Sequence, residues 1–325
     1  MSFSTTILEW FAANGRELPW RGTRDPYAIW LSEIILQQTR IEQGRPYWER
    51  FVSRWPTVEA LAAATEDEVL RQWQGLGYYS RARHLHAAAR QVVGMGGFPT
   101  TLEGIRQLKG VGDYTAAAIA SIAFNVPAAA VDGNVYRVLS RHYGIDTPIN
   151  TAEGKHTFAA LAQSLLPRQC PGTFNQAMMD FGALQCTPQS ARCLLCPLQE
   201  SCEALRQGRV GQLPVKQRRL TVRERRLVYV YIRCRGFVAI RRRPSGDIWQ
   251  GLYEPWLTEE PVPAAARLVC QNVRHVLTHR ILFADFYLWQ TDERPCLPAE
   301  YFWIAEPDLS DYALPRLVER LLESL

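Results

Sequence analysis

The segment Leu108-Lys109-Gly110-Val111-Gly112 joins two predicted helices, over 101–108 and 113–124, and Asp113-Tyr114-Thr115 begins the second. Two glycines with one apolar residue between them favour a tight interhelical turn. The backbone N–H groups at the start of the second helix then point outward and form a site for an anion. The sequence therefore predicts that Lys109, Gly110, Val111 and Gly112 contact phosphate groups.

A Gly-x-Gly turn is a weak signal by itself, because many helices end at glycine. The Leu-Lys-Gly-Val-Gly context between two helices strengthens it. Together they are typical of a helix-hairpin-helix motif, which grips a DNA backbone without reading its sequence.

Helical patterns dominate the first two thirds of the chain. Asp25-Pro26 has the residues of an N-cap and first helical position, and predicts a helix reaching about Glu42. After about residue 226 the pattern becomes β-rich. We therefore expect a helical domain over 1–208, a basic linker over 209–226 and a smaller α+β domain over 227–325. The other predicted helices lie at about 47–54, 57–63, 66–74, 80–93, 134–143, 153–166, 173–184 and 314–325, and the predicted strands at 227–233, 237–241, 280–290 and 301–304.

Composition and charge narrow the class of protein. The 325 residues are 47% hydrophobic and 21% charged, as in a soluble globular protein. No apolar run approaches the ~18 residues of a membrane span, and the N-terminus lacks a signal-peptide pattern, so we expect a cytoplasmic protein with no membrane partner. Residues 209–243 carry 12 Lys and Arg against one acidic residue, Glu224. This stretch indicates either a polyanionic partner or a solvated linker.

Four cysteines lie close together as Cys186-x6-Cys193-x2-Cys196-x5-Cys202. Structural disulfides are rare in cytosolic proteins, so this group predicts a metal site rather than four small buried residues. Zinc ribbons usually contain two short Cys pairs, and here there is one. The wider spacing favours a [4Fe–4S] cluster with one thiolate for each iron. Such a cluster would hold the 186–202 loop in place.

Two carboxylates are candidates for acid and electrostatic chemistry. Glu33 lies mid-helix with mainly apolar neighbours at helical spacing, which predicts a raised pKa suited to a general acid. The alternative is an exposed glutamate on a surface stripe. Asp132 lies directly before a predicted helix, where an aspartate is most often an N-cap. It becomes a catalytic candidate only together with Glu33 and the hairpin.

These features in combination resemble the helix-hairpin-helix DNA glycosylase superfamily, and within it the MutY family of adenine DNA glycosylases. The motifs that carry the resemblance are Leu18-Pro19-Trp20-Arg21, Trp30-Leu31-Ser32-Glu33, Leu36-Gln37-Gln38-Thr39, Gly75-Leu76-Gly77-Tyr78-Tyr79-Ser80-Arg81 and Val131-Asp132-Gly133-Asn134-Val135. The resemblance implies a monomeric enzyme of base excision repair that acts on double-stranded DNA. It implies removal of adenine mispaired with 8-oxoguanine or guanine.

The resemblance also implies residue roles. Glu33 matches the acid that protonates the flipped adenine, and Asp132 the carboxylate that stabilises the sugar cation. Asn134 matches the residue that orients Asp132, and Tyr114 the tyrosine beside the sugar. The positions that match the adenine pocket or the probe of the opposite base are Arg16, Trp20, Arg21, Leu36, Gln176, Gln38 and Tyr78.

The C-terminal part has its own resemblance. Residues 247–255, Asp-Ile-Trp-Gln-Gly-Leu-Tyr-Glu-Pro, are similar to a segment of the family's Nudix-like domain, which helps to recognise 8-oxoguanine. Leu277-Thr278-His279 stands where the family has Phe-Ser-His, so Thr278 and His279 keep a hydroxyl and an imidazole that can donate hydrogen bonds. We see no Nudix catalytic motif and expect no pyrophosphohydrolase activity.

Two alternatives to an adenine glycosylase remain at this stage. One is an endonuclease III-like glycosylase and lyase for damaged pyrimidines, a family that carries a catalytic lysine where Tyr114 stands. A lysine amine would form a Schiff base with the sugar and nick the strand. The other is a non-catalytic iron–sulfur DNA-binding protein, which has no need of both Glu33 and Asp132. We therefore expect a monofunctional glycosylase with little or no lyase activity.

Overall fold

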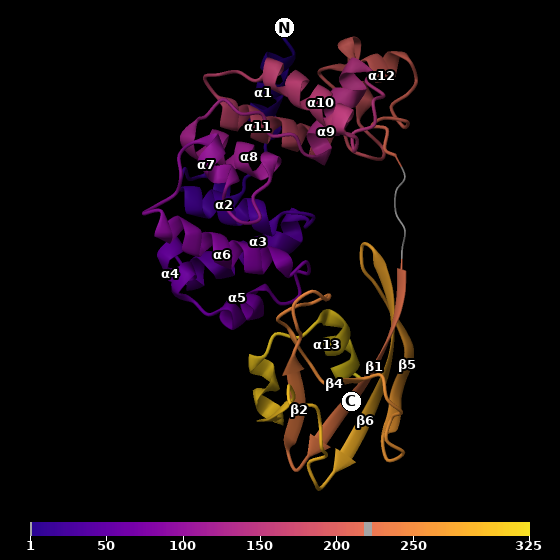
Figure 1. Ribbon diagram of the computed structural model, residues 1–325. Coiled ribbons are helices and arrows are strands. Elements are labelled where there is room, and N and C mark those ends of the chain that lie inside the picture. Colours follow the sequence, from indigo (N-terminus) through magenta and orange to yellow (C-terminus); the bar gives the residue numbers. More distant parts are fainter. Residues whose placement is uncertain (1, 218–222) are drawn as a thin grey trace. The chain divides into compact units, whose positions relative to one another are not determined.

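The computed structural model describes residues 2–217 and 223–325, and these residues form two compact units (Figure 1). The first unit comprises Met1–Trp48, Arg54–Ala62 and Ala87–Arg218. The second comprises Glu49–Ser53, Ala63–His86 and Arg219–Leu325. Residues 218–222, which belong to the predicted basic linker, lie outside the described residues. The domain boundaries expected at 208 and 227 stay a prediction.

Helices build the first unit. In the described part of the chain, no helix is both long enough and apolar enough to cross a membrane.

Helices α3 and α6 contribute residues to both units. The elements are α1 (Phe3–Asn14), η1 (Pro19–Arg21), α2 (Pro26–Ile35), α3 (Ile41–Arg54), α4 (Val58–Ala63), α6 (Ser80–Gly94), α7 (Leu102–Arg106), α8 (Asp113–Phe124), α9 (Gly133–Tyr143), α10 (Ala152–Leu165), α11 (Pro171–Asp180), η2 (Phe181–Gln185), η3 (Cys193–Leu195), η4 (Gln199–Ser201) and α12 (Glu203–Arg206).

Helix α8 lies at the centre of this unit, since it packs against α2, α7 and α11. Its residues from Thr115 to Ser121 are all buried. Most of this stretch is alanine, and small side chains at a contact allow helix axes to approach closely. A second core forms where α1, α9, α10 and α11 meet around Phe158, Phe174 and Phe181. These two cores fix the helices whose ends line the site described below.

Several helices differ from the sequence-based expectation, among them α12, which was not predicted. The helix expected to reach Glu42 ends at Ile35, because Gln38 adopts a left-handed φ of 54° in the turn that follows. A new helix, α3, then begins at Ile41. Helix α1 was not predicted, although Ser2 caps it by accepting a hydrogen bond from the Thr5 N–H at 3.2 Å. A serine three residues ahead of a polar residue is a common pattern, so this cap was a weak signal in the sequence.

A mixed sheet forms most of the second unit. Its strand order is β3-β2-β1-β6-β5 within the described residues, with β4 paired to β1 and β7 to β2. The central pair, β1 and β6, is parallel, and Arg223 pairs with Arg280 at its beginning. The elements are α5 (Glu66–Trp73), β1 (Arg223–Cys234), β2 (Phe237–Arg242), β3 (Tyr253–Glu254), β4 (Trp256–Thr258), β5 (Arg267–Val276), β6 (Arg280–Thr291), β7 (Phe302–Ala305), η5 (Glu306–Asp311) and α13 (Arg316–Leu322).

Helix α13 covers one face of this sheet. Its Leu317 and Leu321 are buried against Tyr229, Tyr231 and Phe286 of the central strands. The strands predicted from β-rich segments are present as β1, β2, β6 and β7, whereas β3, β4 and β5 were missed. Strand β5 is mostly exposed and has irregular register on both sides of Cys270, so its side chains do not alternate cleanly. Alternation is the signal by which a half-buried strand is recognised.

Candidate active site

One cleft of about 760 Å³ in the first unit collects most of the predicted site residues. It opens between the end of α2 and its following turn, the start of α8, the start of α9 and one side of α11. The predicted residues in its lining are Arg16, Trp20, Arg21, Glu33, Leu36, Gln38, Gly112, Tyr114, Asp132, Asn134 and Gln176. These positions are far apart in the sequence, and the packing of the helices brings them together around one cleft.

Glu33 projects from α2, a helix of ten residues of which eight are buried. Burial raises the pKa of the Glu33 carboxyl to about 7. Hydrogen bonding from the Tyr114 hydroxyl and the charge of Arg21 oppose this rise, and the charge of Asp132 adds to it. At neutral pH this carboxyl is therefore a proton donor and acceptor of comparable strength, as general acid–base chemistry requires.

Asp132 is the N-cap of α9, as its position in the sequence predicts, and it also lines the cleft. One carboxylate oxygen accepts hydrogen bonds from the Asn134 N–H at 2.9 Å and the Val135 N–H at 2.8 Å. The other oxygen accepts from Asn134 Nδ2 at 2.7 Å. Burial raises the pKa of Asp132, while these three donors and Arg137 oppose the rise because they favour the charged form.

The amide of Asn134 is itself held in one orientation. Arg137 Nη2 donates to Asn134 Oδ1 at 2.8 Å and to the Gly182 carbonyl at 2.6 Å. With its oxygen engaged, the Asn134 amide presents its NH₂ group to Asp132. Gly182 also lies directly against Asn134, since a Cβ there would come within 2.6 Å of the Asn134 Cβ. This arrangement supports the orienting role predicted for Asn134, which stays a prediction.

Tyr114 lies in the first turn of α8, directly after the hairpin, and its phenol interacts with both Glu33 and Asp132. Its hydroxyl lies 3.5 Å from Met179 Sδ and interacts with Glu33. Burial and the charges of Glu33 and Asp132 raise the pKa of Tyr114 well above its usual value. The side chain is therefore a neutral hydroxyl at physiological pH. Unlike a lysine amine, it cannot form a Schiff base with a sugar.

Asp180, a residue not singled out in the sequence, organises the arginines of the cleft. Its side chain has no exposed surface, and it forms ion pairs with Arg16 and Arg21. Arg21 donates to both carboxylate oxygens, at 2.7 and 2.8 Å, and Arg16 Nε donates to one of them at 2.9 Å. Burial tends to raise the pKa of Asp180, but the hydrogen bonds from Arg21 and Arg16 outweigh it and hold that pKa below its usual value.

Other lining residues were also missed, among them Ser32, Gln37, Thr115 and Met179. Gln37 Nε2 donates to Thr115 Oγ1 at 3.2 Å, which ties the end of α2 to α8. Gln37 and Thr115 are each next to a predicted site residue in the sequence, and this position was the only indication in the sequence that they line the cleft. Which neighbour of a site residue faces a cleft depends on the helix packing.

The hairpin has the form expected of it. Gly110 adopts a left-handed φ of 77°, and Gly112 is the N-cap of α8. Leu108 and Val111 are buried and anchor the turn, whereas Lys109, Gly110 and Gly112 are exposed. The Lys109 N–H donates to Gln91 Oε1 at 2.7 Å, which fixes the approach to the turn. Backbone N–H groups at the start of α8 are thus presented on an exposed, anchored loop.

Tyr78, Thr278 and His279 belong to the second unit and are not among the residues that line the cleft. The Tyr78 hydroxyl lies 2.6 Å from Thr278 Oγ1, so two residues separated by 200 positions form a hydrogen bond. Tyr78 has a left-handed φ of 48°, as Gln38 does in the first unit. Strained backbone of this kind occurs preferentially at functional sites.

The four clustered cysteines line one small cavity with Arg141, Leu205 and Val210. Arg141 Nη1 lies 3.4 Å from Cys186 Sγ, and burial together with the other three cysteines raises the pKa of the Cys196 thiol to about 11. No group of three or more His, Cys, Asp or Glu side chains in residues 2–217 and 223–325 is arranged to hold a single metal ion. A shared cavity of four thiols beside a buried guanidinium is a donor set that fits an anionic iron–sulfur cluster.

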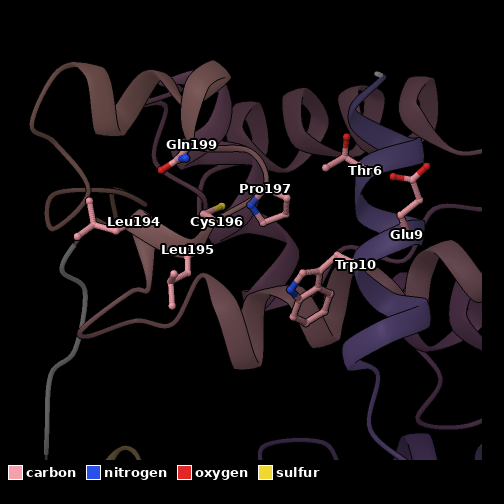
Figure 2. Close-up of a pocket in the computed structure, with 8 residues that line it drawn as sticks. All are labelled: Thr6, Glu9, Trp10, Leu194, Leu195, Cys196, Pro197 and Gln199. Atoms are coloured by element: carbon pink, nitrogen blue, oxygen red, sulfur yellow. The ribbon is translucent and has the colours of Figure 1, made fainter.

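A separate hollow lies between α1 and the cysteine loop (Figure 2). Figure 2 shows Thr6, Glu9 and Trp10 on α1 at one side, and Leu194, Leu195, Cys196, Pro197 and Gln199 at the other. Leu194 and Leu195 are 87% and 80% exposed. The hollow has one carboxylate and no second titratable side chain except Cys196, so it lacks the pair of carboxyls that lines the larger cleft.

Comparisons with known proteins identify the families to which the two parts of the chain are similar. Residues 31–164 match the HhH-GPD superfamily of base excision DNA repair proteins, and residues 228–324 match the NUDIX domain. An adenine DNA glycosylase of Buchnera aphidicola subsp. Acyrthosiphon pisum is 30% identical over 348 residues, which cover 99% of this chain and 97% of that protein. These matches confirm the predicted family, the helix-hairpin-helix glycosylase fold and the Nudix-like C-terminal part.

Two further proteins add to the comparison. Rat adenine DNA glycosylase is 44% identical over 227 residues, 66% of this chain and 44% of that protein, so the chain spans less than half the length of this relative. A thermostable thymine-DNA glycosylase of known structure is 32% identical, with a TM-score of 0.59 over 63% of this chain and 95% of that one. The likeness extends over a length close to that of the helical part.

Replacing Asp180 by Asn should lower the free energy of unfolding of the first unit. The change leaves two partly buried arginines without their carboxylate, at a cost of about 2–4 kcal/mol after allowance for solvent screening. Because the folded pKa of Asp180 is lowered, its contribution is present above the unfolded pKa of about 3.9 and is lost as pH falls below it. Urea unfolding of both proteins at pH 7 and at pH 3 measures this difference.

The matched control is Asp146→Asn, which removes an exposed ion pair with Arg209. Exposed pairs contribute ~0–1 kcal/mol, so this variant should unfold almost as the wild type does. Equal destabilisation by the two substitutions, or a loss at Asp180 that is the same at both pH values, would contradict the assignment.

Proposed function

Since this chain belongs to the family of adenine DNA glycosylases, we propose that it hydrolyses the N-glycosidic bond of adenine mispaired with 8-oxoguanine or guanine in double-stranded DNA. One observation carries the proposal: Glu33, with a pKa of about 7, shares a cleft with Asp132, whose charge three hydrogen bonds support. Two carboxyls in different environments are the means by which one site supplies both an acid and a negative charge.

Glu33 is the general acid of the proposal. Adenine leaves the sugar readily only when a ring nitrogen carries a proton, and in the family this is N7. The charge of Asp132 is one of the causes that raise the pKa of Glu33, so the two carboxyls favour a state in which Glu33 is protonated and Asp132 is ionised. General acid catalysis of this kind contributes ~10²–10⁴ in rate.

Asp132 stabilises the sugar as the C1′–N9 bond breaks. The electrons of that bond leave with the protonated adenine, and positive charge develops on the sugar ring. The Asp132 carboxylate is already held by the Asn134 and Val135 donors, so it needs no rearrangement to face this charge. Water then adds to C1′ and gives its proton to Glu33, which restores the acid and leaves an abasic site.

Tyr114 supports a glycosylase that does not nick the strand. A lyase of this fold needs an amine to form a Schiff base with the opened sugar. The phenol at this position has a strongly raised pKa and lies between Glu33 and Met179, so it is a neutral hydrogen-bonding group. We therefore favour hydrolysis over lyase chemistry and over the endonuclease III-like alternative.

The target adenine must leave the duplex before it can reach the cleft, at a cost of a few kcal/mol. Gln38 and Tyr78 are proposed to enter the base stack, and stacking on an aromatic ring recovers ~1–3 kcal/mol. Thr278 and His279 are proposed to recognise the 8-oxoguanine left behind. The exposed hairpin from Lys109 to Gly112 would hold the backbone of the duplex through its N–H groups.

We assign Cys186, Cys193, Cys196 and Cys202 to one [4Fe–4S] cluster. The thiols line a common cavity, and Arg141 lies 3.4 Å from the Cys186 sulfur and can offset negative charge there. The cluster would cross-link the loop to the start of α12, and the proposed chemistry at Glu33 and Asp132 does not pass through it. A cytoplasmic, monomeric enzyme is part of the same proposal.

Glu33→Gln should abolish base release while leaving duplex binding intact. The amide keeps the shape of the side chain but cannot supply the proton, so the single-turnover rate should fall ~10²–10⁴-fold. The measurement uses labelled duplexes with adenine opposite 8-oxoguanine, guanine or thymine, each split with and without alkali. Strand cleavage that requires alkali indicates a monofunctional glycosylase.

The control for charge removal is Glu153→Gln, an exposed residue in the first turn of α10, which should leave the rate unchanged. An unchanged rate in the Glu33→Gln protein would refute the mechanism. Adenine release without preference for 8-oxoguanine would refute the role of Thr278 and His279 only, and no release from any duplex would refute the adenine assignment.

The pH profile tests the proton on Glu33. The single-turnover rate should fall as pH rises through about 7, because Glu33 then loses its proton. In Tyr114→Phe this limb should move to higher pH, since the hydroxyl that lowers the pKa of Glu33 is gone. The same limb in both proteins, or its survival in Glu33→Gln, would show that another group titrates.

Iron analysis and visible absorption test the cluster. The purified protein should contain about four iron atoms per chain if the thiolates hold one cube. Cys202→Ser should lose iron, while Cys270→Ser should retain it, because Cys270 lies in strand β5 and does not line the cavity. Zinc in place of iron, or equal iron in both variants, would overturn the assignment.

A further inference from the structure

Three arginines gather around one carboxylate in the second unit. Asp247, in the loop that follows β2, accepts hydrogen bonds from Arg225 Nη1 at 2.6 and 2.7 Å and from Arg243 Nη2 at 2.7 Å. Arg280 Nη1 lies farther away, at 3.4 Å from Asp247 Oδ1. One negative charge therefore faces three positive charges.

The excess positive charge lies on the exposed members of this cluster. The Arg243 side chain is only 1% exposed and is shared with the fully buried Glu254, which also binds Arg241. The Arg225 and Arg280 side chains are 34% and 39% exposed. Since Glu254 and Glu300 together offset the charges of Arg241 and Arg243, Asp247 remains as the counter-charge for Arg225 and Arg280.

Most N–H donors of the Arg280 guanidinium are not engaged by Asp247. Within the described residues it makes one ion pair, the contact to Asp247 at 3.4 Å, which is too long for a strong charge-assisted hydrogen bond. A guanidinium carries five N–H donors in a planar fork that matches the oxygens of a phosphate. Arg225, by contrast, is held firmly by both Asp247 oxygens.

The cluster adjoins the turn that carries Thr278 and His279. Arg280 is the first residue of β6, and its carbonyl accepts from the Leu277 N–H at 2.8 Å, which closes this turn. In the parallel register of β1 and β6, Arg223 faces Arg280 and Arg225 comes two residues later. Side chains two apart point to the same face, so Arg225 and Arg280 lie on one side of the sheet.

We infer that Arg280, supported by Arg225, binds a backbone phosphate of the DNA strand that carries 8-oxoguanine. This inference rests on the proposed function, which brings that strand to Tyr78 and Thr278. Asp247 holds the two arginines together in the absence of DNA by offsetting their mutual repulsion. A phosphate would then complete an alternating arrangement of two guanidinium groups and two anionic groups, and would fix the strand in register with the turn.

The test measures duplex affinity as a function of salt. It uses the full-length protein in a Glu33→Gln background, so that the labelled duplex with adenine opposite 8-oxoguanine is not consumed. Loss of one phosphate contact reduces the slope of log Kd against log salt by ~0.9. Arg280→Gln should show this reduction and weaker binding, while Arg280→Lys should keep the slope because it keeps the charge.

The matched control is Arg294→Gln, which removes the same charge beyond the far end of β6, where Arg294 lies over the Phe237 and Trp303 rings. Its slope should equal that of the parent. An unchanged slope in Arg280→Gln would overturn the inference and leave Arg280 as a residue that only closes the turn. Adenine release by the wild type, measured in parallel, reports separately on the proposed function.

Discussion

The start of helix α9 is the constraint on which the site depends. A helix leaves its first N–H groups without partners, and Asp132 satisfies two of them with one oxygen. The same carboxylate faces the cleft, so the cap and the proposed catalytic group are one residue. Because the cap fixes the backbone of Asp132 and Asn134 together, the carboxylate cannot turn away from the cleft without breaking the end of the helix.

From this end, α9 extends to the cysteine loop. Arg137 reaches Asn134 at one side and the Cys186 carbonyl at the other, and Arg141 contacts Cys186 and the carbonyls of Thr187 and Pro188. Buried guanidinium groups with several carbonyl partners are costly to disturb. The loop and the capped end of the helix are consequently parts of one rigid element, whatever the loop binds.

The second unit joins a segment from early in the chain to the C-terminal sheet. Arg242 forms ion pairs with Glu66 and Asp67, the Tyr253 hydroxyl donates to Asp67, and the Gln74 amide donates to Glu319 of α13. These contacts hold the turn around Tyr78 beside the turn of Thr278. A residue proposed to enter the base stack and a residue proposed to read the lesion thus share one framework.

The sequence by itself determined the features that arise from short stretches of chain. Asp25-Pro26 begins a helix, the glycines of 110 and 112 make the hairpin, and the cysteine spacing defines one loop, because capping and turn chemistry act within a few residues. The family and the fold class followed from these motifs taken together. The predicted end of α2 was wrong, because the left-handed turn at Gln38 contains no glycine from which it could have been predicted.

Only the tertiary structure decided which of these features meet. Glu33 has a raised pKa because the packing of the helices buries it and brings the charge of Asp132 near it, and Asp180 binds Arg16 and Arg21 across more than 150 positions of sequence. Desolvation and Coulomb interactions depend on distance in space, so a chain read in order does not contain them. Local chemistry made Asp132 a cap, and the packing of helices made it part of a cleft.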